Sequence, residues 1–258
     1  MTAPEHLVVD VRESVLRVCI NRPEKRNALS RAVLEELGRV FEEHGSDTSL
    51  RAAVITGAGN KSFAAGGDLK EFASLRSEAD AQALFRRANE ALGEVRRFAV
   101  PVVAAVNGLA LGGGAELALA CDFRVAAAHA GIGFVQGRLN ISTGFGGGTD
   151  LFELMGTRRA LRLLTEARVL DAEEACHIGL FDVAATRDEA LENCLERFLE
   201  PIRALAPQVL RAFKALASDH RIGLTRAARE HREQTEFVHT WVHPDHWAAA
   251  DQLLARKS

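Results

Sequence analysis

The chain has 258 residues, enough for one large domain that buries its own core without disulfides or metal ions. Hydrophobic residues make up 47% and charged residues 26% of the chain, and the formal net charge is −3. These values are ordinary for a globular protein, and the lack of net positive charge argues against general binding to nucleic acid.

The cysteines and the apolar stretches indicate the compartment. The four cysteines are far apart and form no C-x-x-C pair, as is usual in a reducing intracellular setting. The first six residues lack the pattern of a signal peptide. The longest apolar stretch, residues 100–111, is interrupted by Pro101, Asn107 and Gly108 and is too short to cross a membrane. We therefore expect a cytoplasmic protein with no membrane partner.

The first half of the chain alternates predicted strands and helices. Residues 7–11 and 15–20 predict two strands around a turn. Ser30 is typical of a helix N-cap, the apolar residues after it have helical spacing, and Gly45 ends the helix. Further elements are predicted at 52–56 (strand), 78–97 (helix), 102–106 (strand), 115–120 (helix) and 123–125 (strand). This alternation predicts an α/β layered fold.

The last part of the chain is almost entirely helical in pattern. Asp171-x-x-Glu174 and Thr186-x-x-Glu189 are capping-box patterns. A soft boundary near Glu196 divides a core of residues 1–195 from a C-terminal helical region of residues 196–258. Helix breaks are expected at Pro201, Pro207, Gly223 and Pro244.

Three segments are rich in glycine and small residues, at 63–70, 108–116 and 144–148. Glycine lets the backbone approach a ligand closely. A glycine run between a strand and a helix also leaves the first helical N–H groups unpaired, and these attract negative charge. Gly113 lies at such a junction, with Glu116 in the first turn of the helix. The alternative is that these glycines serve only turns and tight packing.

Several fingerprints of other enzyme classes are incomplete. Residues 54–59 resemble a dinucleotide-binding turn, but the last position of that pattern is Ser62. The chain has no tyrosine, so a short-chain dehydrogenase would lack its catalytic residue. Neither a P-loop nor a G-x-S-x-G elbow occurs. The histidines at 239, 243 and 246 have no acidic partner pattern, so we expect no metal site.

Three segments in order resemble the crotonase superfamily, which includes enoyl-CoA hydratases and isomerases. They are residues 21–29 (NRPEKRNAL), 63–70 (FAAGGDLK) and 101–117 (PVVAAVNGLALGGGAEL). The resemblance covers nearly the whole chain. It implies an α/β fold with a crotonase-like spiral of ββα repeats and a C-terminal helical region that builds homotrimers or hexamers. It also implies an acyl-CoA substrate and no cofactor other than the coenzyme A of that substrate.

The resemblance assigns catalytic roles to three of these residues. The backbone N–H groups of Gly67 and Gly113 correspond to an oxyanion hole, in which each donor contributes roughly 3–4 kcal/mol to transition-state stabilisation. Glu116 corresponds to one of two catalytic acids. The alternative for Glu116 is a first-turn glutamate that only compensates the helix dipole.

The same resemblance predicts the coenzyme A site. The wall around the nucleotide and pantetheine is expected from Ala28, Ala64, Ala65, Gly66, Asp68, Leu69 and Lys70. Lys25 or Arg26 is expected to contact the phosphates, since cations suit that task. The alternative for these two residues is a solvated loop.

The second acid of the hydratases is the main departure from the family pattern. In the segment 134–139 its position is matched to Arg138, which stays protonated and cannot act as a base. Three interpretations remain open. Glu116 alone serves hydration or isomerisation; Arg138 orients the carboxylate of a malonyl-type CoA that is decarboxylated; or Arg138 points away and another acid, such as Glu153, substitutes.

The leading hypothesis is hydration of a 2-enoyl-CoA to a 3-hydroxyacyl-CoA through a thioester enolate, a lyase reaction. Decarboxylation of a malonyl-type CoA is the first alternative, because loss of CO₂ gives the same enolate. A protein that binds CoA thioesters without turnover is the second.

Overall fold

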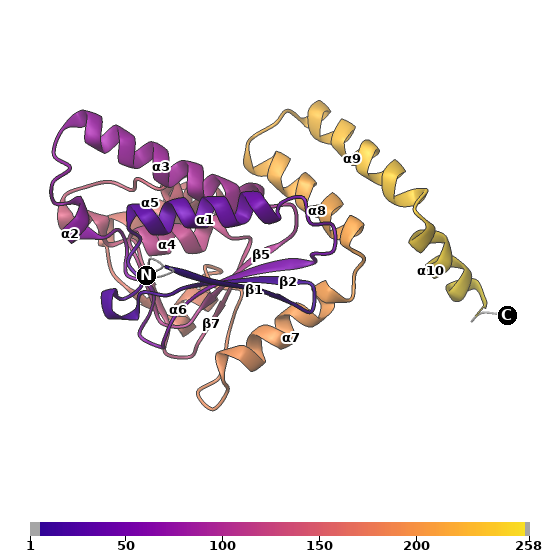
Figure 1. The fold of residues 1–258 in the computed structure, drawn as a ribbon, viewed down its shortest axis with the longest axis horizontal. Coiled ribbons are helices and arrows are strands. Elements are labelled where there is room, and N and C mark those ends of the chain that lie inside the picture. The colour runs from indigo at the N-terminus through magenta and orange to yellow at the C-terminus, as the bar shows by residue number, and fades with distance from the viewer. Residues whose placement is uncertain (1–5, 256–258) are drawn as a thin grey trace, which may run out of the picture.

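The computed structural model describes residues 6–255, whose core is built on two sheets (Figure 1). The larger sheet has six strands in the order β1-β2-β3-β5-β7-β10. β1 and β2 form an antiparallel hairpin, and the other neighbours are parallel. The strands are β1 (Leu7–Arg12), β2 (Val15–Ile20), β3 (Ala52–Gly57), β5 (Val102–Val106), β7 (Phe123–Ala126) and β10 (Val183–Ala184).

The smaller sheet has four short strands in the order β4-β6-β8-β9. β4, β6 and β8 are parallel, and β9 is antiparallel to β8. The strands are β4 (Ser62–Ala64), β6 (Leu109–Leu111), β8 (Gly131–Gly133) and β9 (Leu170–Asp171). These strands were not predicted, because two or three residues are too few to show a period.

The chain repeats one unit, in which a strand of the larger sheet is followed by a strand of the smaller sheet and then by a helix. β3, β4 and α2–α3 form the first such unit, β5, β6 and α4 the second, and β7, β8 and η2–α5 the third. The predicted spiral of ββα repeats is therefore confirmed. The helices are α2 (Leu69–Phe72), α3 (Glu78–Arg97), α4 (Gly113–Ala120), the 3-10 turn η2 (Val135–Leu139) and α5 (Gly147–Glu166).

The two faces of the larger sheet pack against different helices. Alternate residues of β3 separate the faces: Ala53 and Ile55 lie in the main core, with α1 (Arg31–His44) and α3. Val54 packs on the other face, against Leu195 and other residues of α7 (Leu191–Arg203). This alternation follows from the two-residue period of a strand.

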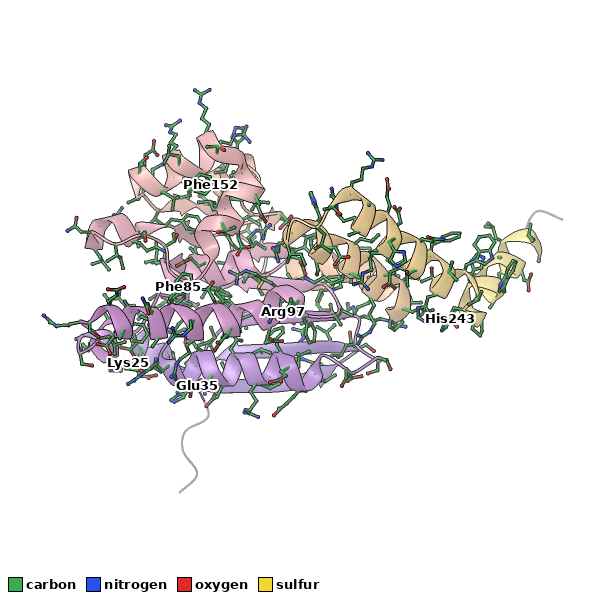
Figure 2. All side chains as sticks on the ribbon, turned by 90° about the horizontal axis from the view of Figure 1, so that it is seen from above. Lys25, Glu35, Phe85, Arg97, Phe152 and His243 are labelled. Atoms are coloured by element: carbon green, nitrogen blue, oxygen red, sulfur yellow. The ribbon has the colours of Figure 1, made fainter. Side chains whose placement is uncertain are left out.

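The C-terminal helices leave the core gradually. The expected boundary near Glu196 falls inside α7, which packs on the sheet. α8 (Pro207–Arg221) stays attached through Lys214, whose Nζ lies 2.6 Å from Oδ1 of Asp122. α9 (Arg226–Trp241) and α10 (Pro244–Ala255) extend away from the body as an arm, with His243 between them (Figures 1 and 2).

Two of the predicted helix caps are confirmed, and two other expectations about the helices are not. The hydroxyl of Ser30 accepts the Val33 N–H at 3.2 Å and caps α1 as predicted. Asp171 forms the predicted capping box of α6 (Ala172–His177). Thr186 instead begins only a turn, and Pro201 lies within the last turn of α7 and does not break it, so both expectations were wrong. Within residues 6–255, none of the helices combines the length and the hydropathy that a bilayer crossing requires.

Candidate active site

Two glycine-containing loops follow neighbouring strands of the smaller sheet. β4 leads into residues 65–68, and β6 leads through Gly112 into α4. Because β4 and β6 are parallel neighbours, both loops lie at the same edge of the sheet. Gly66 has a φ of +102° and Gly112 a φ of +52°, values that residues with side chains rarely adopt. Each of these glycines directly precedes a candidate donor, Gly67 or Gly113.

The amides of Gly67 and Gly113 lie close together. A Cβ atom placed on Gly113 would be 3.5 Å from the amide nitrogen of Gly67. Within residues 6–255 neither amide donates to an acceptor. The β-bridge beside Gly67 uses the N–H groups of Leu29 and Asp68 and leaves that of Gly67 unused. Gly113 is the first residue of α4, at the positive end of the helix dipole. The pair can therefore hold an oxygen on which negative charge develops.

Two aromatic rings cover these amides. A Cβ atom on Gly67 would lie 2.7 Å from the ring of Phe72, and one on Gly113 would lie 2.7 Å from the ring of Phe145. Both distances are shorter than any normal contact between two non-bonded carbon atoms, so a side chain at either glycine would displace a ring. The rings place apolar surface beside the donors, and in such surroundings a hydrogen bond to a charged oxygen is stronger than in water.

Glu116 lies in the first turn of α4 and is only 2% exposed. Its Oε1 accepts the backbone N–H groups of Phe145 at 2.8 Å and Gly147 at 3.0 Å. Its Oε2 accepts Nε2 of Gln136 at 2.9 Å. Gly147 begins α5, so Oε1 faces the positive end of a second helix dipole. Oε1 is fully occupied by two donors, whereas Oε2 has one and keeps acceptor capacity.

The environment of Glu116 favours proton exchange. Burial raises the pKa of this carboxyl above its ordinary value of 4.5, because the charged form loses hydration. The hydrogen bonds from Phe145, Gln136 and Gly147 lower the pKa and offset part of that rise. A carboxyl with a raised pKa is suited to taking up a proton and returning it in one reaction cycle.

A cavity of about 340 Å³ lies in front of Glu116, between the two glycine loops and the η2 turn. Among its lining residues within the described part of the chain, Glu116 is the only ionisable one. Large apolar side chains dominate the rest, and Phe85 of α3 lies at the end of the molecule that also carries Lys25 (Figure 2). The larger apolar lining side chains are Leu69, Phe72, Leu84, Phe85, Val135, Leu139, Ile141 and Phe145.

The structure brings some of the predicted residues to this cavity and leaves others outside it. The predicted residues that line it are Ala65, Gly66, Gly67, Leu69, Gly113 and Glu116. Ala64 is buried, with its carbonyl so close to α4 that a Cβ on Gly114 would lie 1.9 Å from it. Ala28 is partly buried, and Lys25, Arg26 and Lys70 are exposed. None of these five lines the cavity.

Asp68 has a structural task in the loop after β4. It caps α2 by accepting the Glu71 N–H, and its Oδ2 pairs with Nη2 of Arg22 at 3.0 Å. Nη1 of Arg22 also donates to the Ala28 carbonyl at 2.7 Å. Partial burial opposes the charge of Asp68, but the hydrogen bonds from Arg22 and Glu71 and the charge of Lys25 outweigh it and lower the pKa. Arg22 therefore ties together the two loops expected to contact coenzyme A.

Arg138 lies outside the cavity, as the third of the open interpretations expects. It is exposed and does not line the cavity, to which η2 contributes Val135, Gln136 and Leu139 instead. Glu153 is also exposed and lines separate depressions beside Arg221. Neither side chain lines the cavity beside Glu116.

Three residues around Glu116 were missed by the sequence analysis. Gln136 belongs to the segment 134–139, in which the sequence analysis considered only Arg138 for a role in the site. Phe145 lies in the third glycine segment, which gave a weak signal. Arg96 donates to the Phe145 carbonyl at 2.9 Å and pairs with Asp150 at 2.8 Å, and nothing in the sequence indicated this.

Comparison with known proteins identifies the family of the chain. A sequence model for the family described as enoyl-CoA hydratase/isomerase matches residues 10–249. The chain belongs to the enoyl-CoA hydratase/isomerase family. It is 36% identical over 222 residues to a crotonyl-CoA hydratase of Syntrophomonas wolfei, covering 84% of this chain and 83% of that protein. It is 34% identical over 209 residues to a short-chain-enoyl-CoA hydratase of Clostridium acetobutylicum, covering 81% and 79%.

A solved structure extends the likeness to the fold. An enoyl-CoA hydratase from Bacillus anthracis superposes with a TM-score of 0.90 at 32% identity, covering 98% of this chain and 97% of that one. The match to the enoyl-CoA hydratase/isomerase family spans every residue that lines the cavity. Within the described part of this family member, no three His, Cys, Asp or Glu side chains are placed to hold a metal ion.

Proposed function

We propose that this enzyme hydrates a 2-enoyl-CoA to a 3-hydroxyacyl-CoA, with Glu116 as its only acid–base group. The observation that carries the proposal is the placement of two amides, those of Gly67 and Gly113, beside one buried carboxylate in one cavity. Neither amide has an acceptor in the part of the chain that the structure describes. A thioester carbonyl held by these amides would bring its reactive carbons near Glu116. The relatives named as hydratases support this choice of reaction.

The proposed reaction adds water in two connected steps. A water oxygen bonds to C3 of the enoyl group while its proton passes to Oε2 of Glu116. The electrons of the C2–C3 double bond move into the thioester, whose oxygen becomes negative and accepts the N–H groups of Gly67 and Gly113. C2 then takes the proton back from Oε2. One hydrogen of the water ends on C2 and the hydroxyl on C3, so Glu116 is restored.

The two oxygens of Glu116 divide the work. Oε1 is held by Phe145 and Gly147 and fixes the orientation of the carboxyl group. Oε2 retains acceptor capacity and is assigned to proton transfer. A single carboxyl can serve as base and then as acid because its pKa is raised by burial.

Coenzyme A is proposed to enter as part of the substrate, and the reaction needs no other cofactor. Lys25, Arg26 and Lys70 are exposed cations on the loops that Arg22 ties together. Their charges suit the coenzyme A phosphates, whereas the apolar cavity suits the acyl group. Ala28 and Asp68 support the wall of that entrance through their contacts with Arg22.

Water uptake by crotonyl-CoA tests the proposal directly. The purified protein is expected to convert crotonyl-CoA and longer 2-enoyl-CoA esters into products heavier by one water, as measured by mass spectrometry. Absence of water uptake across the panel would overturn the assignment. Tight binding of the esters without any turnover would instead support a non-catalytic binder.

Decarboxylation of a malonyl-type CoA is the second candidate, and the electrostatics of the cavity favour it. No cation lines the cavity within the described residues, so a substrate carboxylate there would lack a counter-ion. A poorly stabilised carboxylate loses CO₂ more readily, because loss of the charge relieves the ground state. The electron pair of the broken bond would form the same enolate, and Glu116 would donate a proton to C2. The panel of CoA esters used to test hydration can be extended with malonyl-, methylmalonyl- and ethylmalonyl-CoA. Decarboxylation gives a product lighter by one CO₂, whereas hydration gives a product heavier by one water.

The C-terminal arm is proposed to pack against further copies of this chain, as a homotrimer or as a hexamer of two trimers. No residue of α9 or α10 is buried within the described part of the chain. Exposed apolar side chains on the arm are Phe237, Val238, Trp241, Val242, Trp247, Leu253 and Leu254. Such a surface is typical of an interface. Light scattering after gel filtration is expected to give three or six chains; a monomer would contradict the proposal.

A further inference from the structure

Among the described residues, Gln136 is the only side chain that hydrogen-bonds to the Glu116 carboxylate. It is 8% exposed, belongs to η2 and lines the cavity. Its Nε2 donates to Oε2 of Glu116 at 2.9 Å. Its own Oε1 is buried and has no hydrogen-bond partner among the described residues.

The unpartnered Oε1 shows what determines the orientation of this amide. A buried carbonyl without a donor lowers stability. Turning the amide over would place Oε1 against the Glu116 carboxylate, where two acceptors repel each other, and would remove the donor from Oε2. The negative charge of Glu116 therefore dictates the observed orientation. A leucine of similar size would bury no unpartnered oxygen, so fold stability does not explain an amide at this position.

We infer that Gln136 is a positioning residue that keeps Glu116 ionised and holds its Oε2 ready to accept a proton. This inference rests on the proposed function, because it assumes that Glu116 is the base. A donor to a carboxylate favours the charged form. A second carboxylate 2.9 Å away would have the opposite effect, because the two acids would share one proton and titrate together. With an amide at position 136, Glu116 therefore titrates without coupling to a second acid.

Other charges around Glu116 are already neutralised or lie outside the cavity. On the side of α3 and α5, Arg96 pairs with Asp150, and Arg221 of α8 lies 3.8 Å from the other oxygen of Asp150. On the side of η2, the only charged residue, Arg138, is exposed. Glu116 is the only charged residue of α4. Gln136 is therefore the side chain through which the titration of Glu116 can be changed most directly.

The test compares the pH profiles of Gln136→Leu and Gln136→Glu with that of the parent enzyme. In both variants the acid limb of kcat/KM for crotonyl-CoA is expected to move to higher pH, further for Gln136→Glu because a charge is added. At pH values below the acid limb, kcat/KM of the variant is expected to be about tenfold lower than that of the parent for each pH unit by which the limb moves. The loss is expected in kcat, with KM nearly unchanged. Gln82→Leu is the matched control, because Gln82 donates to Glu78 at 3.1 Å on the exposed face of α3.

A second measurement does not need turnover. The carboxyl carbon of Glu116 is titrated by ¹³C NMR, with Glu116→Gln used to assign the signal, in the parent and in Gln136→Leu. A raised titration midpoint in the variant supports the inference. An unmoved midpoint, or a loss of activity that is equal at every pH, would overturn it. Failure of the parent enzyme to hydrate any enoyl-CoA while the midpoint still moves would overturn the proposed function and the role of Glu116 as the base in hydration, but would support the control of Glu116 ionisation by Gln136.

Discussion

Gly147 and Glu116 fit against each other so closely that neither could change without moving the other. The Gly147 N–H donates to Oε1 of Glu116 at 3.0 Å, and a Cβ atom on Gly147 would lie 2.4 Å from Cγ of Glu116. The third glycine segment thus serves the carboxylate rather than an anion in the substrate. It places the start of α5 against the side chain and leaves no room for a methyl group.

Gly147→Ala is expected to reduce turnover of the substrate by about a hundredfold, because a misplacement of about 1 Å at a catalytic group costs that much. The variant should stay folded, since a displacement of that size at the start of α5 relieves the contact with Glu116. The kcat of the purified variant checks the expectation. Gly137→Ala is the matched control: its Cβ would meet its nearest neighbour at 3.7 Å, an ordinary contact, and its activity should match that of the parent.

Glu116→Gln is expected to lower the hydration rate by about 10²- to 10⁴-fold, the usual contribution of a general acid–base group. The fold should be kept, because the new amide oxygen can accept the N–H groups of Phe145 and Gly147. Binding of the CoA ester, measured by calorimetry, should change little. Hydration at the parent rate would contradict the role given to this carboxyl.

The alternation of strands and helices in the core could be predicted because the long elements have clear periods. The spiral of ββα repeats was implied only by the resemblance to the crotonase superfamily. Residues 15–20, 52–56 and 102–106 were expected as strands, and the structure has strands there. The short strands of the smaller sheet could not be found this way. Gly67 and Gly113 were assigned through the family resemblance, but their closeness depends on the pairing of β4 with β6, which no local pattern encodes.

The sequence alone could not predict which side chain of the segment 134–139 contacts Glu116. The sequence left three interpretations of Arg138 open, and the structure shows that η2 turns so that Gln136 reaches Glu116 while Arg138 is exposed. In a 3-10 turn of five residues the inward position depends on how the turn enters and leaves, and the chain leaves this one through Asn140 with a left-handed φ of 56°. Only the three-dimensional structure decides between residues two positions apart.

Arg22→Ala is expected to lower the free energy of unfolding by about 3 kcal/mol, because it leaves the largely buried Asp68 carboxylate without its partner. The side chains of this pair are 13% and 12% exposed. Chemical denaturation followed by far-ultraviolet circular dichroism checks the value. Arg39→Ala, which breaks an exposed pair with Glu43 on α1, should cost only about 0.5 kcal/mol. Equal losses in the two variants would show that the tie between the loops is weak.

The same pair predicts a dependence of stability on pH. The pKa of Asp68 is lowered in the folded protein, so its contribution is present above the unfolded pKa and is lost as pH falls through the folded one. The difference in Tm between the parent and Asp68→Asn should therefore shrink as the pH is lowered below about 4. A difference that stays constant down to pH 2 would contradict this assignment.

Glu116 should change stability with pH in the opposite direction, because its pKa is raised in the folded protein. The folded state holds the proton more tightly than the unfolded one, so this favourable contribution is complete below the unfolded pKa and is lost as pH rises through the folded value. Glu116→Gln removes the effect. The Tm of this variant relative to the parent should therefore rise as the pH increases from about 4 towards neutrality. Scanning calorimetry at several pH values measures it, and a relative Tm that falls over this range would show that burial does not raise the pKa of Glu116.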